Sequence, residues 1–414
     1  MIKAIKVQLK PNNKQNSQLF GCAGAARWSY NFTLAAIEKH YAETGKFLSD
    51  NEIRKSITQI KRMEEFGWLN KYSNNIPKQA VKDACGAYKK FFKHLAEHPK
   101  FKSKKRSKPA FYHEGTKLKF TDKHCQIEKL GKVKMSEFGR IPIGEKYSNP
   151  RITFDGLDWW VAVGVEVGEL TINKEPTQGI GIDLGIKNLA IISTGDVFKN
   201  INKSKAIRKA KKKLKRLQRQ TSRQYEKSKL KGGRYKKTKN IIKTENRIRK
   251  VYARLSGVRN NNLHQITTFL VKTKPEYIVM EDLNVKGMMK NKHLSEAIAE
   301  QCWGEFRRQV EYKSGWYGSN FKLADRFYPS SKACNHCGAI NRELKLSDRM
   351  FVCQECGVVK DRDFNASLNL RDYGKQNTDS IVGNLSLWSV ISNESTIRAV
   401  RKSDTVKQEK NINF

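Results

Sequence analysis

The carboxylate of Asp183 lies in a stretch of sequence whose pattern is that of paired β-strands. Residues 179–193, GIGIDLGIKNLAIIS, place this one acid between two short apolar runs. β-Branched residues at this density favour strands, and the glycine between the runs favours a turn, so we predict a hairpin. A carboxylate among isoleucines costs free energy unless it binds a cation, a proton or a hydrogen-bond donor. Alternatively, Asp183 could simply begin the Asp-Leu-Gly turn.

Two later stretches also join an apolar element to acidic residues. Residues 277–283, YIVMEDL, have the pattern of an apolar strand that ends in Glu281. Residues 361–370, DRDFNASLNL, place Asp361 and Asp363 at the head of a helical pattern. Each acid has an ordinary alternative role, at a strand end or as a helix N-cap. Three carboxylates that converge on one sheet, however, would hold two divalent metal ions about 4 Å apart, an arrangement that cleaves phosphodiesters.

The eight cysteines fall into two groups. Four of them follow the pattern CxxC-x15-CxxC, whose spacing fits tetrahedral zinc: Cys334, Cys337, Cys353 and Cys356. Because thiolates fill all four ligand positions, this zinc is expected to be structural and not catalytic. Disulfides are the alternative, which a reducing compartment disfavours. The isolated cysteines are expected to be small buried hydrophobic residues: Cys22, Cys85, Cys125 and Cys302.

The chain is strongly basic, with 82 Lys and Arg against 40 Asp and Glu and a formal net charge of +42. Such a charge predicts a polyanionic partner, with nucleic acid as the leading candidate. Residues 201–250 contain 22 Lys or Arg and two Glu, with apolar residues at helical spacing. We therefore predict helices with an apolar seam and a cationic outer surface, although a solvated charge run is the usual alternative. The sequence has no apolar stretch of about 20 residues and no signal-peptide core, so we expect a protein of the cytoplasm without membrane attachment.

These motifs together resemble one protein family. GIDLGIKNLA, IVMEDLN, the CxxC pairs and DRDFNASLNL are similar to the RuvC-type nuclease core of the transposon-encoded TnpB (OrfB) proteins, relatives of compact type V CRISPR effectors. KVQLKPN, AYKKFF and WGEFRRQVEYKSGWYG extend the resemblance to about residues 1–375. It implies an RNA-guided DNA endonuclease of a transposable element, whose catalytic acids match Asp183, Glu281 and Asp363. In the family's third motif the metal-binding Asp stands directly before x-Asn-Ala, which selects Asp363 over Asp361.

The resemblance also implies cofactors and partners. Two Mg²⁺ ions, for which Mn²⁺ could substitute, would bind Asp183, Glu281 and Asp363, and one structural Zn²⁺ would bind the four paired cysteines. A guide RNA from the element's own locus would select double-stranded target DNA by base pairing, next to a short DNA motif read by the protein. We expect a monomer in a prokaryotic cytoplasm that acts on chromosomal or plasmid DNA.

The resemblance further implies an α+β fold with several domains, namely an RNase H-like (RuvC) nuclease domain with an inserted zinc ribbon and an N-terminal β-barrel wedge domain that carries a helical recognition insertion. The expected bounds are 1–12 for the first barrel strand, 13–98 for the recognition lobe, 99–175 for the rest of the barrel, 176–325 for the nuclease core with basic helices at 203–258, 326–358 for the zinc ribbon, and 359–376 for the third motif of the core. Residues 377–414 lack apolar periodicity and are expected to be mostly disordered.

Two other functions share parts of this pattern. A nuclease-inactive, RNA-guided DNA-binding repressor would lack one of the three carboxylates, and none is missing. A conventional transposase would share the acids, but we see no resemblance to a strand-transfer module or to an end-binding helix-turn-helix. The endonuclease is therefore the favoured interpretation.

Overall fold

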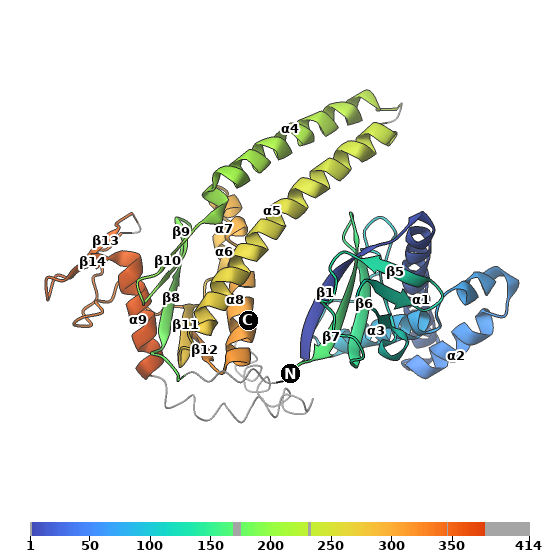
Figure 1. Cartoon of the computed structure of the whole chain (residues 1–414), viewed down its shortest axis with the longest axis horizontal. Coiled ribbons are helices and arrows are strands. Elements are labelled where there is room, and N and C mark those ends of the chain that lie inside the picture. Colours follow the sequence, from blue (N-terminus) through green and yellow to red (C-terminus); the bar gives the residue numbers. More distant parts are fainter. Residues whose placement is uncertain (1, 169–174, 231–232, 346, 377–414) are drawn as a thin grey trace, which may run out of the picture. The chain divides into compact units, whose positions relative to one another are not determined.

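The structure is a computed structural model that describes residues 2–168, 175–230, 233–345 and 347–376 (Figure 1). The chain divides into two compact units, Met1–Glu169 and Leu170–Phe414, and each is described by itself. No helix within these ranges combines the length and the apolar character that a membrane span requires. The tail predicted to be disordered, 377–414, lies outside the described residues.

The first unit contains a seven-stranded antiparallel sheet in the order β2-β6-β7-β1-β5-β4-β3. Its strands are β1 Ile2–Lys10, β2 Ala110–Tyr112, β3 Lys119–Phe120, β4 His124–Ile127, β5 Gly131–Met135, β6 Tyr147–Phe154 and β7 Trp159–Glu166. Apolar and polar residues alternate in β1 and β7, the pattern of half-buried strands, and the structure buries Val7, Val161 and Val163 in one core. Among the described residues β2 and β3 form the two ends of the sheet, so the hydrogen-bonded pairs do not close the barrel expected here.

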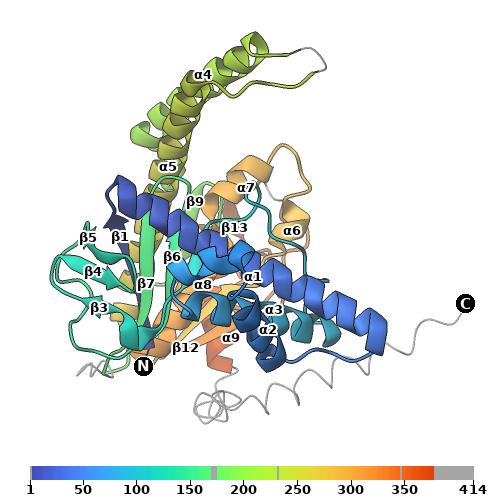
Figure 2. The same cartoon turned by 90° about the vertical axis from the view of Figure 1, so that its right-hand side faces the viewer.

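Three helices accompany this sheet: α1 Asn13–Thr44, α2 Asp50–Ile60 and α3 Asn75–Phe92, with 3₁₀ turns at Glu64–Lys71 and Gly115–Lys117. Helix α1 crosses one face of the sheet (Figure 2) and buries Leu19 and Cys22 in the shared core. Residues 49–52, SDNE, have the sequence form of a capping box, and the structure forms it: the side chains of Ser49 and Glu52 accept each other's backbone N–H. Apolar residues at helical spacing continue as far as Leu95. Helix α3 nevertheless ends at Phe92, and Leu95 is 55% exposed.

The second unit is built on a five-stranded sheet in the order β10-β9-β8-β11-β12. Its strands are β8 Ile180–Leu184, β9 Asn188–Ile192, β10 Val197–Lys199, β11 Tyr277–Glu281 and β12 Asn320–Ala324. The predicted hairpin is confirmed as the antiparallel pair β8 and β9, while β11 lies parallel to both β8 and β12. The sequence of residues 322–328 is typical of a strand, but β12 begins earlier, at Asn320, and ends at Ala324.

The helices of the second unit are α4 Lys205–Lys227, α5 Lys239–Lys272, α6 Val285–Met288, α7 Ser295–Gln301, α8 Trp303–Tyr317 and α9 Arg362–Gln376, with a 3₁₀ turn at Ile201–Lys203. Helices α4 and α5 form an antiparallel pair that extends away from the sheet (Figure 1). The predicted apolar seam is confirmed, with Ile207, Leu214 and Leu255 buried between the two helices.

Apolar residues between positions 294 and 317 recur at helical spacing, which predicts one amphipathic helix, but the structure breaks this helix in two. The pattern over residues 294–317 divides into α7 and α8 at Cys302, whose φ of 55° lies in the left-handed region. The Gln301 amide at this break donates hydrogen bonds to the carbonyls of Gly185 and Ile186. The break therefore fastens the end of α7 to the turn that follows Asp183, a long-range contact that the helical periodicity does not reveal.

The five-stranded sheet lies between two helical layers, with α9 on one face and α5 and α8 on the other (Figure 1). Ile180 and Ile182 of β8 belong to the core formed with α5 and α8. On the opposite face Val279 of β11 packs with Leu370 of α9. Because side chains alternate along a strand, Gly181 and Asp183 of β8 face α9.

Candidate active site and metal centre

Asp183 and Glu281 occupy matching positions on neighbouring parallel strands. The register pairs Ile278 with Ile180 and Met280 with Ile182, so the next residue of each strand is one of the two acids. Both acids lie at the carboxyl ends of their strands, the edge at which open α/β sheets bind their ligands. The predicted convergence of the first two motifs thus follows from strand register.

Asp363 comes from α9 and approaches the same edge. A Cβ atom on Gly181 would lie 2.0 Å from the Ser367 carbonyl oxygen, so α9 rests directly on β8 at this point. Asp183 is two residues further along the strand, and Asp363 is four residues before Ser367 in the helix. Two residues of a strand and four residues of a helix each cover about 6 Å. The contact at Gly181 therefore fixes the position of α9 along β8 so that Asp363 lies level with Asp183.

The three acids repel one another. Burial, followed by the charges of Glu281 and Asp363, raises the pKa of Asp183 well above its usual value. Burial and the charge of Asp363 also raise the pKa of Glu281, against the lowering effect of the hydrogen bond that the Ser330 hydroxyl donates to it. A cation among these oxygens would relieve the repulsion, and carboxylate oxygens are the ligands that Mg²⁺ prefers.

Asp363 is paired with two arginines. The Arg362 guanidinium donates to its Oδ1 at 2.8 Å, and Arg349 Nη1 lies 3.8 Å from its Oδ2. Asp361 instead caps α9, because its Oδ1 accepts the backbone N–H groups of Asp363 and Phe364, each at 3.0 Å. Asp361 therefore fills the helix-cap role. The Asp363 carboxylate, 20% exposed, lies near enough to Asp183 for its charge to raise that residue's pKa.

The four paired cysteines form one cluster. Their Sγ atoms all lie within 4.8 Å of one another, with Cys334 and Cys356 at 3.7 Å and Cys337 and Cys353 at 3.5 Å. A tetrahedral zinc ion with bonds of about 2.3 Å would separate its sulfurs by about 3.8 Å, so the cluster fits this metal. Within the described ranges the three carboxylates do not gather so closely.

The segment that carries the cysteines is a short ribbon joined to α9. Strands β13 Met350–Val352 and β14 Val359–Asp361 pair antiparallel and lead directly into the helix. Hydrogen bonds from the backbone N–H groups of Cys356 and Glu355 lower the pKa of Cys353 to about 6. These hydrogen bonds favour the thiolate form of Cys353, the form that binds metals.

Two buried asparagines of α9 hold the loop that precedes the first cysteine pair. Asn365 Nδ2 donates to the Ala333 carbonyl at 2.7 Å, and Asn369 Nδ2 donates to the carbonyls of Ser330 and Ala333 at 2.6 and 2.7 Å. Asn335, inside the first cysteine pair, donates its N–H to Asn365 Oδ1. Because Ser330 also holds Glu281, this loop connects the cysteine cluster to two of the acids. Sequence reasoning missed Ser330, Arg349 and Arg362, whose partners are set by packing.

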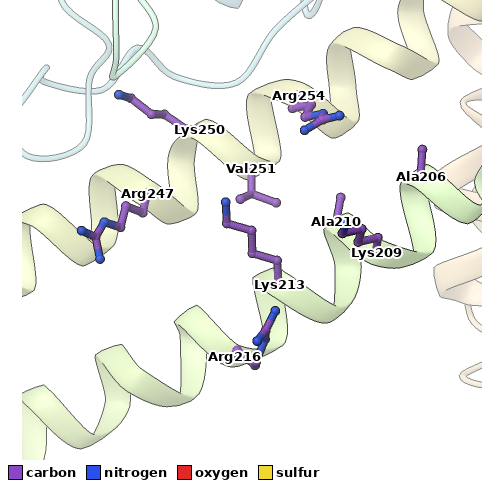
Figure 3. Close-up of a pocket in the computed structure, with 9 residues that line it drawn as sticks. All are labelled: Ala206, Lys209, Ala210, Lys213, Arg216, Arg247, Lys250, Val251 and Arg254. Atoms are coloured by element: carbon purple, nitrogen blue, oxygen red, sulfur yellow. The ribbon is translucent and has the colours of Figure 1, made fainter.

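A basic groove runs between α4 and α5 (Figure 3). It encloses about 440 Å³, and Figure 3 shows Lys213 extending from α4 toward Val251 of α5. Its lining combines small apolar and cationic side chains: Ala206, Lys209, Ala210, Lys213, Arg216, Arg247, Lys250, Val251 and Arg254. The cationic residues of this groove belong to the basic helices that were predicted from the charge of residues 201–250.

Three family models match parts of the chain. A Cas12f1-like TNB domain matches residues 303–370, an OrfB_IS605 model described as "Probable transposase" matches 162–292, and a helix-turn-helix domain of OrfB_IS605 matches 1–46. The last match corrects our expectation that no helix-turn-helix resemblance exists. In the structure, however, the described residues of this range contain strand β1 and one long helix, α1.

Relatives cover nearly the whole chain. A protein of Streptomyces pristinaespiralis named "Putative RNA-guided DNA endonuclease" is 30% identical over 371 residues, which are 89% of this chain and 88% of the relative. InsQ of Escherichia coli (strain K12), which has the same description, is 29% identical over 385 residues, 89% of this chain and 91% of InsQ. A TnpB-like protein of Methanocaldococcus jannaschii is 30% identical over 240 residues, 52% of this chain and 80% of that protein.

The fold is also similar to a solved structure. The Cas12f1 chain in a complex with sgRNA and target DNA has a TM-score of 0.58 with this chain at 12% identity, and the match covers 90% of this chain and 98% of Cas12f1. At this identity the likeness concerns the fold, which is mixed α/β in both. The match to the OrfB model and the identity across nine-tenths of the chain confirm the predicted resemblance: the chain belongs to the TnpB (OrfB) family.

Proposed function

We propose that this protein is an RNA-guided DNA endonuclease of a transposable element and that it cuts double-stranded DNA at Asp183, Glu281 and Asp363. The observation that carries the proposal is the convergence of three acids from separate motifs at one sheet edge, where burial and the neighbouring carboxylates raise the pKa values of Asp183 and Glu281. Strongly perturbed acids at such an edge are typical of functional sites. The names of the relatives support the same activity.

The chemistry proposed is metal-dependent phosphodiester hydrolysis. Two Mg²⁺ ions, or Mn²⁺ in their place, would supply an activated water and stabilise the leaving oxygen. The chain's own residues orient the ligands: Ser330 holds Glu281, and the pairing of Arg362 with Asp363 compensates that carboxylate's charge. Ser330 leaves the second oxygen of Glu281 for other partners. The cysteine cluster would hold one structural Zn²⁺, since its four thiolates leave no open ligand position.

The domain functions are part of this proposal. The sheet order β10-β9-β8-β11-β12, with its antiparallel hairpin beside parallel strands, supports an RNase H-like (RuvC) core at 176–325 and 359–376. The antiparallel sheet of 1–12 and 99–175 would be the wedge domain that grips the guide RNA scaffold, and the helices of 13–98 would be the recognition lobe. A short DNA motif beside the target would be read by the first unit.

The groove between α4 and α5 is proposed to contact the guide–target heteroduplex. Six cationic side chains line it, and the small residues Ala206 and Ala210 let a strand of nucleic acid approach the helix backbone. Contacts of this kind bind phosphates without reading sequence, so base pairing with the guide would select the target. The protein would work as a monomer in a prokaryotic cytoplasm.

The test is plasmid cleavage by the protein purified with RNA from its native locus. The wild type is expected to cut a plasmid that carries the target matching its RNA, only in the presence of Mg²⁺. Asp183→Asn is expected to bind the same plasmid without cutting it. Cleavage by Asp183→Asn at the wild-type rate would overturn the proposed site. Binding without any cleavage by the wild type would indicate the repressor, and strand joining without RNA would indicate the conventional transposase.

A further inference from the structure

Phe327 is far more exposed than any other large hydrophobic side chain of the described residues. Its exposed fraction is 93%, and the next value in those ranges is 65%, at Ile2 near the start of the chain. Single exposed hydrophobic residues are common on protein surfaces and need no special explanation. Phe327 does need an explanation, because it lies between β12 and the cysteine ribbon.

The chain on both sides of Phe327 is fastened. The Arg326 guanidinium binds the carboxylate of Asp282, which follows Glu281 in the sequence. The Tyr328 hydroxyl donates to the Asn369 carbonyl at 3.2 Å, and its ring packs on Tyr373 with 4.8 Å between centroids. Because its neighbours are held by α9 and by the end of β11, the aromatic ring is displayed by a fixed backbone.

Phe327 lies close to the three acids. The register of β11 and β12 pairs Ala324 with Glu281, and Phe327 is three residues beyond Ala324. Three residues further on, Ser330 donates its hydroxyl to Glu281. Three residues span at most about 11 Å when fully extended. The ring is therefore within reach of a nucleotide next to a phosphate bound at the acids.

Cationic side chains lie beside the acidic residues near this position. Arg326 and Arg307 both bind Asp282 and remain exposed, and Arg349 is exposed beside Asp363. Surfaces that bind single-stranded nucleic acid combine cations for the backbone with aromatic rings on which bases stack. Bases within a duplex already stack on one another, so only an unpaired base can stack on the ring of Phe327. Guide pairing displaces one strand of the target and so supplies such bases.

We propose that Phe327 is a positioning residue that stacks on an unpaired base of single-stranded DNA beside the phosphate to be cut. The inference rests on the proposed function and adds the residue that would hold the substrate strand at the site. Because every base has an aromatic face, this contact would be independent of sequence.

The test uses the guide-bound protein with Asp183→Asn, in EDTA, and target DNA with the fluorescent base 2-aminopurine at successive positions around the cut. Stacking is expected to quench the fluorescence at one position. The additional change Phe327→Trp keeps the quenching, whereas Phe327→Ala and Phe327→Leu abolish it, because leucine retains apolar volume without an aromatic face. The control is Phe269→Ala, which removes an exposed phenylalanine of α5 that does not line the basic groove.

In the cleavage-competent protein, Phe327→Ala and Phe327→Leu are expected to slow cutting roughly 10-fold, within the range that alanine substitution of stacking residues gives. Phe327→Trp is expected to cut at nearly the wild-type rate. Unchanged quenching and cutting in Phe327→Ala would overturn the inference, as would a lowered Tm in that variant, which would show that the ring packs against protein. A wild type that quenches the probe but never cuts would overturn only the proposed function.

Discussion

The Ser367 carbonyl lies over Gly181, where a Cβ atom would fall 2.0 Å from its oxygen. Arg371 N would be 2.4 Å from the same atom, so two backbone groups of α9 occupy the space that a side chain would need. Backbone atoms cannot rotate away as a side chain can. The closeness of α9 to β8, and with it the meeting of Asp183 and Asp363, depends on the absence of a side chain at Gly181.

Gly181→Ala is therefore expected to push α9 away from β8. We expect a loss of about 1–3 kcal/mol in the free energy of unfolding, the usual cost of overpacking, together with a strong loss of cleavage. The matched control is Gly257→Ala in α5, where nothing lies within 4 Å of the added Cβ. That change should be neutral or slightly stabilising, because alanine favours helix. Denaturant unfolding of both variants measures the difference, and equal stability would contradict the packing argument.

The two neighbouring acids of the third motif have different expected roles. Asp363→Asn should abolish cleavage, because it removes a negative charge from the group of three acids. Asp361→Asn should cut nearly as well as the wild type, since asparagine is as good an N-cap as aspartate and can accept the same N–H groups. Plasmid cleavage at saturating Mg²⁺ decides between them. Loss of cutting in Asp361→Asn with full activity in Asp363→Asn would reverse the assignment.

Ser330→Ala removes the hydroxyl that holds Glu281. Residues that orient metal ligands typically contribute 10- to 100-fold to metal affinity or activity, so we expect about that increase in the Mg²⁺ concentration for half-maximal cleavage. Ser347→Ala, an exposed serine of the ribbon, is the control. A Mg²⁺ titration of cleavage measures both, and identical curves would show that Ser330 does not orient the acid.

Cys353→Ser is expected to release zinc and to loosen the loop that α9 holds through Asn365 and Asn369. We expect a lower Tm and cleavage reduced by about 10-fold or more, because the same loop positions Glu281. The control is Cys302→Ser, which changes an isolated cysteine outside the cluster. Metal analysis of the purified variants measures whether zinc is released. One zinc per chain in Cys353→Ser would exclude the four-cysteine site.

Lys313 is expected to make the free energy of unfolding depend on pH. It is buried, and its Nζ donates to the His264 carbonyl and to the hydroxyls of Thr267 and Thr268. Burial lowers its pKa from the ordinary 10.5 to about 8. Between these values the unfolded chain binds more protons than the folded chain, so stability rises as the pH rises through this window.

The corresponding experiment compares Lys313→Met with the wild type at about pH 7.5 and about pH 9.5. The wild type should gain in free energy of unfolding relative to Lys313→Met over this interval, because the variant has no proton to release. Lys272→Met, at an exposed position of α5, should follow the wild type. A constant difference between wild type and Lys313→Met at both pH values would show that Lys313 does not titrate there.

Much of the local structure could be predicted because its signals lie within a few residues of one another. The hairpin of β8 and β9, the capping box at Ser49 and the spacing of the four cysteines are of this kind. The strands β2, β3 and β5 were missed since they are short or polar and are held by their neighbours in the sheet. The break at Cys302 was missed because Gln301 binds a turn more than a hundred residues away.

The amino-acid sequence by itself determined which chemical groups the protein has and which short elements carry them: an acid at the end of each of two strands, acids at the start of a helix, four thiols in pairs, and two cationic helices with an apolar seam. Only the tertiary structure decided which of these groups meet. Strand register aligned Asp183 with Glu281, the contact at Gly181 brought Asp363 to them, and packing against α9 exposed Phe327. The physical reason is that local patterns depend on neighbouring residues, whereas the approach of distant side chains depends on how closely whole elements can pack.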